Sequence, residues 1–310
     1  MSIALIVHGG AGTWRPGSDA DALAGIRRAV KAGRDILERQ GSALDAACAA
    51  AVVLEDESVF NAGTGAVLNF DGFVEFDACV MTSHDKGIGA VSGLQRVQNP
   101  ILVARQVMEM TDHVMLTGDG ATRFARVMGH PDYDPVTPAR LADWQDKKQK
   151  LAFGIGRDPQ ASMKIRAFLQ SHPEYAGGTI GAVALDAQGH LCAATSTGGV
   201  TMKLVGRVGD TPLPGCGTYA SIDAAVSATG TGEYVVRSFA GREIADRVAR
   251  GVALDTAMNA VLDQMQADFN ADVGFIALDR HGRTVAAHRT AHMPHGWFRN
   301  DGLTEARMQA

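Results

Sequence analysis

The sequence predicts a mixed α+β protein, because each half of the chain combines strand-like pairs with helix-like pairs. The 310 residues allow either two domains or one large domain. Hydrophobic residues make up 46% and charged residues 20%, so the chain can bury a sizeable core and intrinsic disorder is excluded. The 36 glycines follow no collagen-like period and therefore predict many tight turns.

In the first half of the chain, changes of hydrophobic period mark the predicted elements. Ser18 is positioned to cap one helix, and Ser42 opens the next in the style of a capping box. Asp71-Gly72 is typical of a tight hairpin turn. The predicted elements are a strand at 3–7 with a glycine-rich turn at 8–12, helices at 19–40 and 42–55, strands at 67–70 and 73–81, and a helix at 99–110.

The second half begins after a stretch of weak regularity. Residues 144–178 are polar and interrupted by glycine and proline, so they predict a flexible surface linker, with a short helix near 163–169. Regular patterns then return. They predict strands at 179–185 and 190–195, helices at 233–250 and 254–267, and a hairpin of strands at 273–278 and 284–288.

Charge and cysteine usage narrow the class of protein. The net charge of −5 without a long basic run argues against nucleic-acid binding. The longest apolar stretch, 46–54, is about half a membrane span, and the N-terminus resembles a strand more than a signal peptide. The four cysteines form no C-x-x-C pair, so they predict buried thiols in a reducing compartment, the cytoplasm.

Several familiar site patterns are absent or incomplete. A dinucleotide-binding turn needs G-x-G-x-x-G, but Gly10 and Gly12 are followed by Arg15 at the third glycine position. The sequence contains neither a phosphate-binding P-loop nor a G-x-S-x-G turn. His288, His292 and His295 lie close together in sequence, but the pattern favours a polar hairpin edge over a metal site.

The stretch from 177 to 233 carries the strongest signal, because hydroxyl and charged residues there recur beside glycines. The clusters are Gly-Gly-Thr-Ile-Gly-Ala-Val at 177–183, Thr-Ser-Thr-Gly-Gly at 195–199, Gly-Arg-Val-Gly-Asp at 206–210 and Thr-Gly-Thr-Gly-Glu at 229–233. Thr–Gly turns and helix starts let backbone donors approach a reacting oxygen or an anion. Each cluster alone is equally compatible with ordinary turns and helix caps.

Together, in this order, the clusters resemble the plant-type asparaginase and isoaspartyl peptidase family of N-terminal-nucleophile hydrolases. His-Gly-Gly-Ala-Gly at 8–12 and the segments 60–67 and 77–81 match the same family. The resemblance covers most of the chain and implies a single domain, residues 1–310, with a four-layer αββα sandwich. It also implies self-cleavage between Gly178 and Thr179 into fragments 1–178 and 179–310, which assemble as a dimer of αβ units.

The resemblance implies hydrolysis of L-asparagine and β-aspartyl dipeptides to release L-aspartate, with no cofactor for catalysis. Thr179 would be the nucleophile, since an N-terminal threonine can use its own α-amine as the base. The other roles implied are as follows: Thr197 tunes the nucleophile, Thr229 and Gly230 form the oxyanion hole, Arg207 and Asp210 hold the substrate's α-carboxylate and α-ammonium, Gly232 lines the pocket, and Asn61 stabilises the site. A structural sodium ion would bind main-chain carbonyls of Leu54, Glu55, Phe60, Ala62 and Thr64.

Two alternatives remain open from the sequence. A glycosylasparaginase would act on N4-glycosylated asparagine, although that branch tends to have Thr-Ser-Thr-Asn-Gly where this chain has Gly198. An inactive homologue that only binds aspartate is the alternative from a different class. The region 288–293 departs from the family's usual Phe-Asn-Thr-x-Gly-Met pattern, which affects substrate preference but none of the nucleophile positions.

Overall fold

The protein is built on two β-sheets that stack on each other. The computed structural model describes residues 2–154, 178–300 and 304–309. Eight strands form the larger sheet, in the order β12 (Thr304–Arg307), β11 (His295–Arg299), β1 (Ala4–His8), β5 (Ile180–Leu185), β6 (Leu191–Thr197), β2 (Phe76–Thr82), β3 (Ile88–Leu94) and β4 (Met115–Thr117). The smaller sheet runs β10 (Thr284–His288), β9 (Val273–Asp279), β8 (Ala224–Gly230) and β7 (Thr218–Ala220).

Strand alternation explains why the sheets stack. On β1, Leu5 and Val7 belong to the core under the helices, whereas Ala4 and Ile6 belong to the core shared with Ile276 and Leu278 of the smaller sheet. Successive side chains of one strand therefore serve two different cores. Strands β5 and β6 contact β8 across this interface, which brings their ends close to the end of β8.

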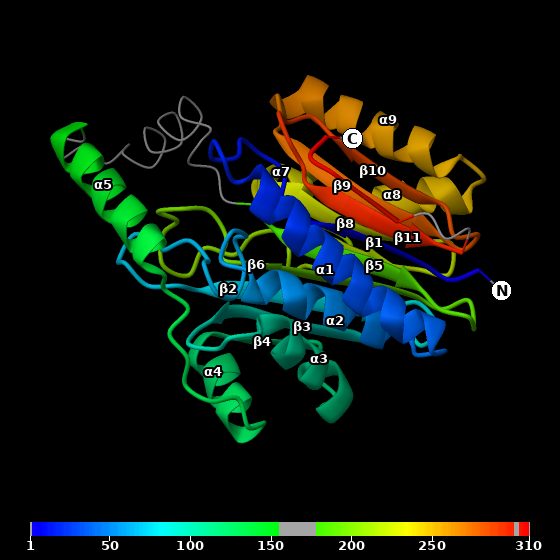
Figure 1. Ribbon diagram of the computed structural model, residues 1–310, viewed down its shortest axis with the longest axis horizontal. Helices are drawn as coiled ribbons and strands as arrows, with labels where there is room; N and C mark the ends of the chain where they lie inside the picture. The colour runs from blue at the N-terminus through cyan, green and yellow to red at the C-terminus, as the bar shows by residue number, and fades with distance from the viewer. Residues whose placement is uncertain (1, 155–177, 301–303, 310) are drawn as a thin grey trace.

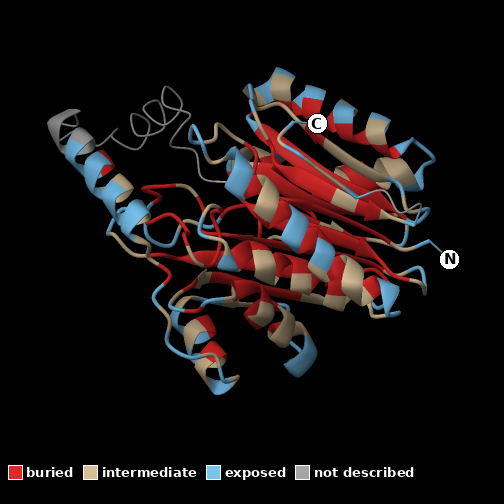
Figure 2. Cartoon of the chain, in the orientation of Figure 1, coloured by how far each residue is buried: buried red, intermediate tan, exposed pale blue. Residues whose placement is uncertain are grey.

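Helices cover the outer faces of both sheets (Figure 1). The larger sheet is covered by α1 (Asp19–Glu38), α2 (Ala43–Asp56) and α3 (Pro100–Met110), and the smaller sheet by α8 (Ala240–Ala249) and α9 (Leu254–Phe269). Figure 2 shows that both sheets and the helix faces against them are buried. Each helix described is too short or too polar to cross a lipid bilayer.

Most sequence-predicted elements are confirmed, including β1, α2, α3, α9 and the β9–β10 hairpin. The Ser42 hydroxyl accepts the Asp45 amide at 3.0 Å, as a capping residue should. Ser18 does begin α1, but its hydroxyl donates to the Arg15 carbonyl instead of capping the helix. The four cysteines are free and buried, as predicted.

The predicted hairpin at 67–70 and 73–81 is wrong. The Asn69 side chain accepts the amides of Asp71 and Phe73, which stabilises a local turn in place of strand pairing. Strand β2 begins only at Phe76 and pairs with β3 and β6. Sequence reasoning assigned no strand at β3, because its small residues carry little strand propensity.

Two other predictions also need correction. The helix at 233–250 is divided into α7 (Gly232–Ser238) and α8, because Phe239 adopts a left-handed conformation with φ of 45°. Residues 144–154 of the predicted linker belong to a helix, α5 (Pro138–Gly154), which projects away from the sheets (Figure 1). The rest of that linker up to 177, including the short helix near 163–169, lies outside the described residues.

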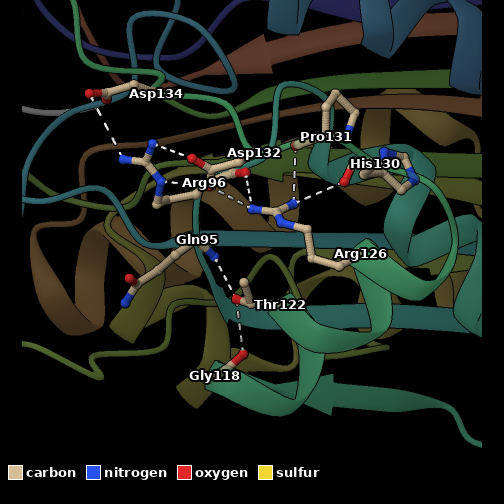
Figure 3. A network of polar contacts seen from close by, with 9 residues as sticks. All are labelled: Gln95, Arg96, Gly118, Thr122, Arg126, His130, Pro131, Asp132 and Asp134. Atoms are coloured by element: carbon tan, nitrogen blue, oxygen red, sulfur yellow. Dashed lines mark hydrogen bonds and ion pairs between the residues drawn. The ribbon is translucent and has the colours of Figure 1, made fainter.

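An ion-pair network fixes the loop between α4 (Gly118–Val127) and α5 (Figure 3). Asp132 contacts the guanidinium groups of Arg96, at 2.6 Å, and of Arg126, at 3.1 Å. Downstream of Asp132, the Tyr133 hydroxyl bonds to Thr64 at 2.8 Å and the Pro135 carbonyl accepts the amide of Gly65. The network therefore anchors a loop that supports the segment following Asn61.

Candidate active site

Three threonines, one just before β5 and two near the ends of β6 and β8, meet where β5 begins. Thr179 directly precedes β5 and is 6% exposed. Its hydroxyl donates to the Thr197 hydroxyl at 3.3 Å, and its amide donates to the Thr229 hydroxyl at 3.2 Å. Since Thr197 ends β6 and Thr229 lies near the end of β8, sheet stacking brings together residues that are far apart in sequence.

Thr197 contacts the bond that the sequence predicts to be cut. Its hydroxyl donates to the Gly178 carbonyl at 3.4 Å and accepts the Gly199 amide at 2.9 Å. One hydroxyl thus touches both the Thr179 oxygen and the carbonyl that precedes it in the chain. This position allows Thr197 to polarise that carbonyl while fixing the orientation of the Thr179 hydroxyl.

Thr229 is buried and bridges the two sheets. Its hydroxyl oxygen accepts the amides of Thr179 and of Ala11, the latter at 3.0 Å. The following residue, Gly230, has φ of 120°, and a Cβ atom there would lie 2.2 Å from the Asp272 carbonyl oxygen. The chain therefore needs glycine immediately after Thr229.

Asn61 fixes the turn that follows Thr197 through hydrogen bonds. Its side-chain amide donates to the Gly199 carbonyl at 2.7 Å, and its backbone carbonyl accepts the Gly198 amide at 3.0 Å. The remaining side-chain oxygen accepts the Val67 amide at 2.8 Å. Asn61 is thus a positioning residue for the Thr197 turn.

Arg207, Asp210 and Gly232 lie together in the structure. A Cβ atom at Gly232 would lie 2.5 Å from an Asp210 carboxylate oxygen and 3.2 Å from the Arg207 guanidinium. Asp210 is 4% exposed, and its Oδ2 atom accepts no hydrogen bond from the described residues. Burial raises the pKa of Asp210 to about 6, although Arg207 opposes the shift.

Arg207 has a partner that sequence reasoning missed. Its guanidinium makes two hydrogen bonds to the Glu233 carboxylate, at 3.0 and 2.8 Å. Glu233 is the last residue of the Thr-Gly-Thr-Gly-Glu cluster, and the sequence pattern predicted no role for it. A bidentate carboxylate on Arg207 shows that the guanidinium is oriented to bind such a group.

A second missed feature is a buried hydrogen-bond chain behind Thr179. The Nε2 atom of His8 contacts the Ser227 hydroxyl at 2.9 Å, and Ser227 contacts the Thr195 hydroxyl at 2.8 Å. Burial, assisted by His295, lowers the pKa of His8 to about 3, so His8 is neutral near pH 7. In the sequence His8 is only the first residue of the 8–12 motif, and nothing in the sequence points to Ser227.

The sequence raised two candidate metal positions, the histidines at 288–295 and the predicted sodium loop, and they offer different ligand atoms. Among the described residues, no group of three or more His, Cys, Asp or Glu side chains could hold a metal ion. Near His288 and His295, both Nδ1 atoms lie within hydrogen-bond distance of backbone carbonyls, those of Thr290 and Met293. In the predicted sodium loop, Leu54 and Glu55 lie in the last turn of α2, where helix carbonyls lack helical partners.

Two stacked sheets with a threonine at the start of a central strand are consistent with the N-terminal-nucleophile hydrolases. Residues 1–307 match the family model described as asparaginase. The chain is 45% identical over 305 residues to a plant-type L-asparaginase of Pyrococcus abyssi, covering 98% of both chains. It is 39% identical over 311 residues to an isoaspartyl peptidase/L-asparaginase of Xenopus laevis, covering 98% and 94%. The chain belongs to the asparaginase family.

The buried neutral His8 generates a prediction about stability. Its pKa is near 6.5 in the unfolded chain and about 3 in the fold, so below pH 6.5 only the unfolded chain takes up the proton. This group should therefore lower the free energy of unfolding by about 2 kcal/mol between pH 6.5 and pH 5. Urea unfolding at several pH values would measure the slope. His8→Gln should show a shallower slope, and equal slopes would contradict the assignment.

Proposed function

We propose that this protein is a self-processing threonine hydrolase that converts L-asparagine and β-aspartyl dipeptides to L-aspartate. The observation that carries the proposal is the convergence of Thr179, Thr197 and Thr229 at the Gly178–Thr179 peptide bond. The relatives' names, plant-type L-asparaginase and isoaspartyl peptidase/L-asparaginase, support the choice of substrates. The packing of helices on both outer faces of two stacked sheets supports a single domain with a four-layer αββα sandwich.

Self-cleavage begins with the Thr179 hydroxyl. Its oxygen attacks the Gly178 carbonyl carbon, the C–N bond breaks, and the hydroxyl proton passes to the departing nitrogen. Water then hydrolyses the ester, which leaves a carboxylate on Gly178 and a free amine on Thr179. Fragments 1–178 and 179–310 result. Thr197 supports this step because its hydroxyl already contacts both the attacking oxygen and the Gly178 carbonyl.

Substrate hydrolysis uses the freed amine as a base. The reference pKa of an α-amine is about 7.7–8.0, which suits proton transfer near neutral pH. Thr179 attacks the substrate's β-carbonyl, and the Thr229 hydroxyl and Gly230 amide stabilise the oxyanion. The C–N bond breaks, the amine leaves with a proton, and water hydrolyses the aspartyl ester.

The amino-acid head of the substrate binds on the side of Arg207 and Asp210. Arg207 receives the α-carboxylate, and the Asp210 carboxylate, whose Oδ2 atom has no hydrogen-bond partner among the described residues, receives the α-ammonium. Gly232 keeps the space between them open. Since Glu233 holds Arg207 in the uncut chain, the substrate carboxylate takes over at least part of that bidentate contact.

The remaining proposals concern a structural sodium ion and the assembly of the protein. A sodium ion is proposed to bind carbonyls of Leu54, Glu55, Phe60, Ala62 and Thr64. The end of α2 supports this, since its dipole favours a cation, but the Glu55 carbonyl already accepts the Thr64 amide and the Phe60 carbonyl a long bond from Arg140. We also expect a dimer of αβ units in the cytoplasm, and catalysis without a metal.

The first prediction from this mechanism concerns maturation. Purified protein should separate into two fragments, and the smaller one should begin Thr-Ile-Gly-Ala at residue 179. Thr179→Ala should remain one chain, because the attacking oxygen is gone, whereas Thr179→Ser should still be cut. Electrophoresis and N-terminal sequencing would measure this. An enzyme that is active while remaining one uncut chain would exclude the mechanism.

The second prediction concerns the head group. β-Aspartyl dipeptides should be hydrolysed and α-aspartyl dipeptides of the same composition should not, because an α-linked peptide lacks the free α-carboxylate. Arg207→Ala should lower kcat/KM for the β-linked substrate by about 10²-fold or more, because the substrate's α-carboxylate would then be buried without its cationic partner. Arg237→Ala, an arginine on α7 outside the pocket, is the control. Comparable hydrolysis of both dipeptides would contradict the head-group assignment.

The third prediction uses the raised pKa of Asp210, about 6. The ionised form attracts the substrate ammonium, and protonation removes this attraction as the pH falls through 6. Below that pH, KM for L-asparagine should therefore rise about tenfold per pH unit. Titration of the Thr179 amine, by contrast, should act on kcat. Asp210→Asn should have a high KM that does not vary over this range; a pH-independent KM in the unmodified enzyme would refute the role of Asp210.

A further inference from the structure

A cavity of about 490 Å³ lies next to the nucleophile, on a side that the head-group site does not use. Its walls include Ala11, Asn61 and Gly178. Each of these three residues is linked directly to one of the site's threonines. The Ala11 amide donates to the Thr229 hydroxyl, Asn61 fixes the turn after Thr197, and Gly178 precedes Thr179 in the chain. Neither Arg207 nor Asp210 lines it.

Two arginines make this cavity suitable for an anion. Arg15 and Arg140 both line it, and they are close enough to interact electrostatically. Arg15 is paired with Asp143, but Arg140 has no carboxylate partner among the described residues. Within the described ranges, the Arg140 guanidinium donates to the carbonyls of Gly65, at 2.5 Å, and Phe60, at 3.4 Å. Burial, with Arg15 contributing, lowers the pKa of Arg140 to about 10, so it remains cationic at pH 7.

The same cavity has an apolar wall. Trp14, Val59 and Phe60 line it, and the Trp14 and Phe60 rings meet edge to face with centroids 5.9 Å apart. A ligand that combines an aliphatic side chain with a carboxylate would match both the aromatic wall and the arginines. The amino acid that leaves from a β-aspartyl dipeptide has this combination, whereas the ammonia that leaves from asparagine has neither part.

We propose that this cavity binds the leaving residue of β-aspartyl dipeptides, with Arg140 recognising its free α-carboxylate. The inference rests on the proposed function, and it adds a second recognition site on the opposite side of the scissile bond from Arg207 and Asp210. The aspartyl head and the leaving residue would then each place a carboxylate on an arginine. Arg140 distinguishes dipeptides from asparagine, because only dipeptides reach it.

The test compares two substrates that differ in one group, β-aspartyl-leucine and β-aspartyl-leucinamide. The unmodified, matured enzyme should prefer the free acid by about tenfold in kcat/KM, as expected for one charged hydrogen bond. The amide releases the less basic amine and is therefore the better leaving group, so a preference for the acid must come from binding. Equal kcat/KM values for the two substrates would overturn the proposal.

Variants then locate the effect. In Arg140→Gln the acid-to-amide ratio should fall towards one, and Arg140→Lys should retain part of the preference. Arg123→Gln, which removes an exposed arginine on α4, should keep the full ratio. A ratio unchanged in Arg140→Gln would place the carboxylate elsewhere and refute the assignment.

The unmodified enzyme keeps the proposal testable even if Arg140→Gln does not fold, because Arg140 also supports two loop carbonyls. The outcomes also separate this inference from the proposed function. If mature protein hydrolyses neither asparagine nor any β-aspartyl compound, the proposed function is wrong. If it hydrolyses asparagine and both leucine derivatives, with no preference for the acid, only the leaving-residue site is wrong.

Discussion

The Thr229 hydroxyl joins the two sheets at the point where the candidate chemistry takes place. It accepts the amide of Ala11, from the loop after β1, and the amide of Thr179, at the start of β5. Both sheets must therefore keep their relative position, or two buried amides lose their acceptor at a cost of about 1–3 kcal/mol each. The pairing of β5 with β6 in the larger sheet sets Thr179 beside Thr197, and the Thr229 contact fixes the Thr179 amide from the smaller sheet.

Two arginines of the candidate site differ in their surroundings. Arg207 is held by the exposed carboxylate of Glu233, while Arg140, without a carboxylate partner in the described part of the chain, lines a cavity. Gly178, which precedes Thr179, lines the same cavity as Arg140, whereas Arg207 does not line it. In the proposed mechanism, these two arginines would favour a substrate with a carboxylate at each end over one with a single carboxylate.

Local signals in the sequence were sufficient for much of the fold. Ser42 marks the start of one helix through its side chain, and this prediction is confirmed, as is the helix predicted at 99–110. Asp71-Gly72 was misleading because Asn69 uses its own side chain to close the turn. The motifs of Thr179, Thr197 and Thr229 were recognisable because, taken together and in order, they resemble a known family, whereas each motif alone is compatible with an ordinary turn or cap. His8 and Ser227 were not recognisable, since 219 positions separate them and only the stacking of the sheets makes them neighbours.

Because Gly181 packs directly against the His8–Ser227 pair, this position limits how the family's genes can diverge. A Cβ atom there would lie 2.0 Å from the Ser227 hydroxyl and 2.6 Å from His8 Nε2. An alanine at this position would therefore fit only if Ser227 and His8 also changed, and such combined substitutions arise rarely. Exposed positions such as Leu204 and Val205 are free of this constraint, so substitutions should be tolerated there more readily than at Gly181.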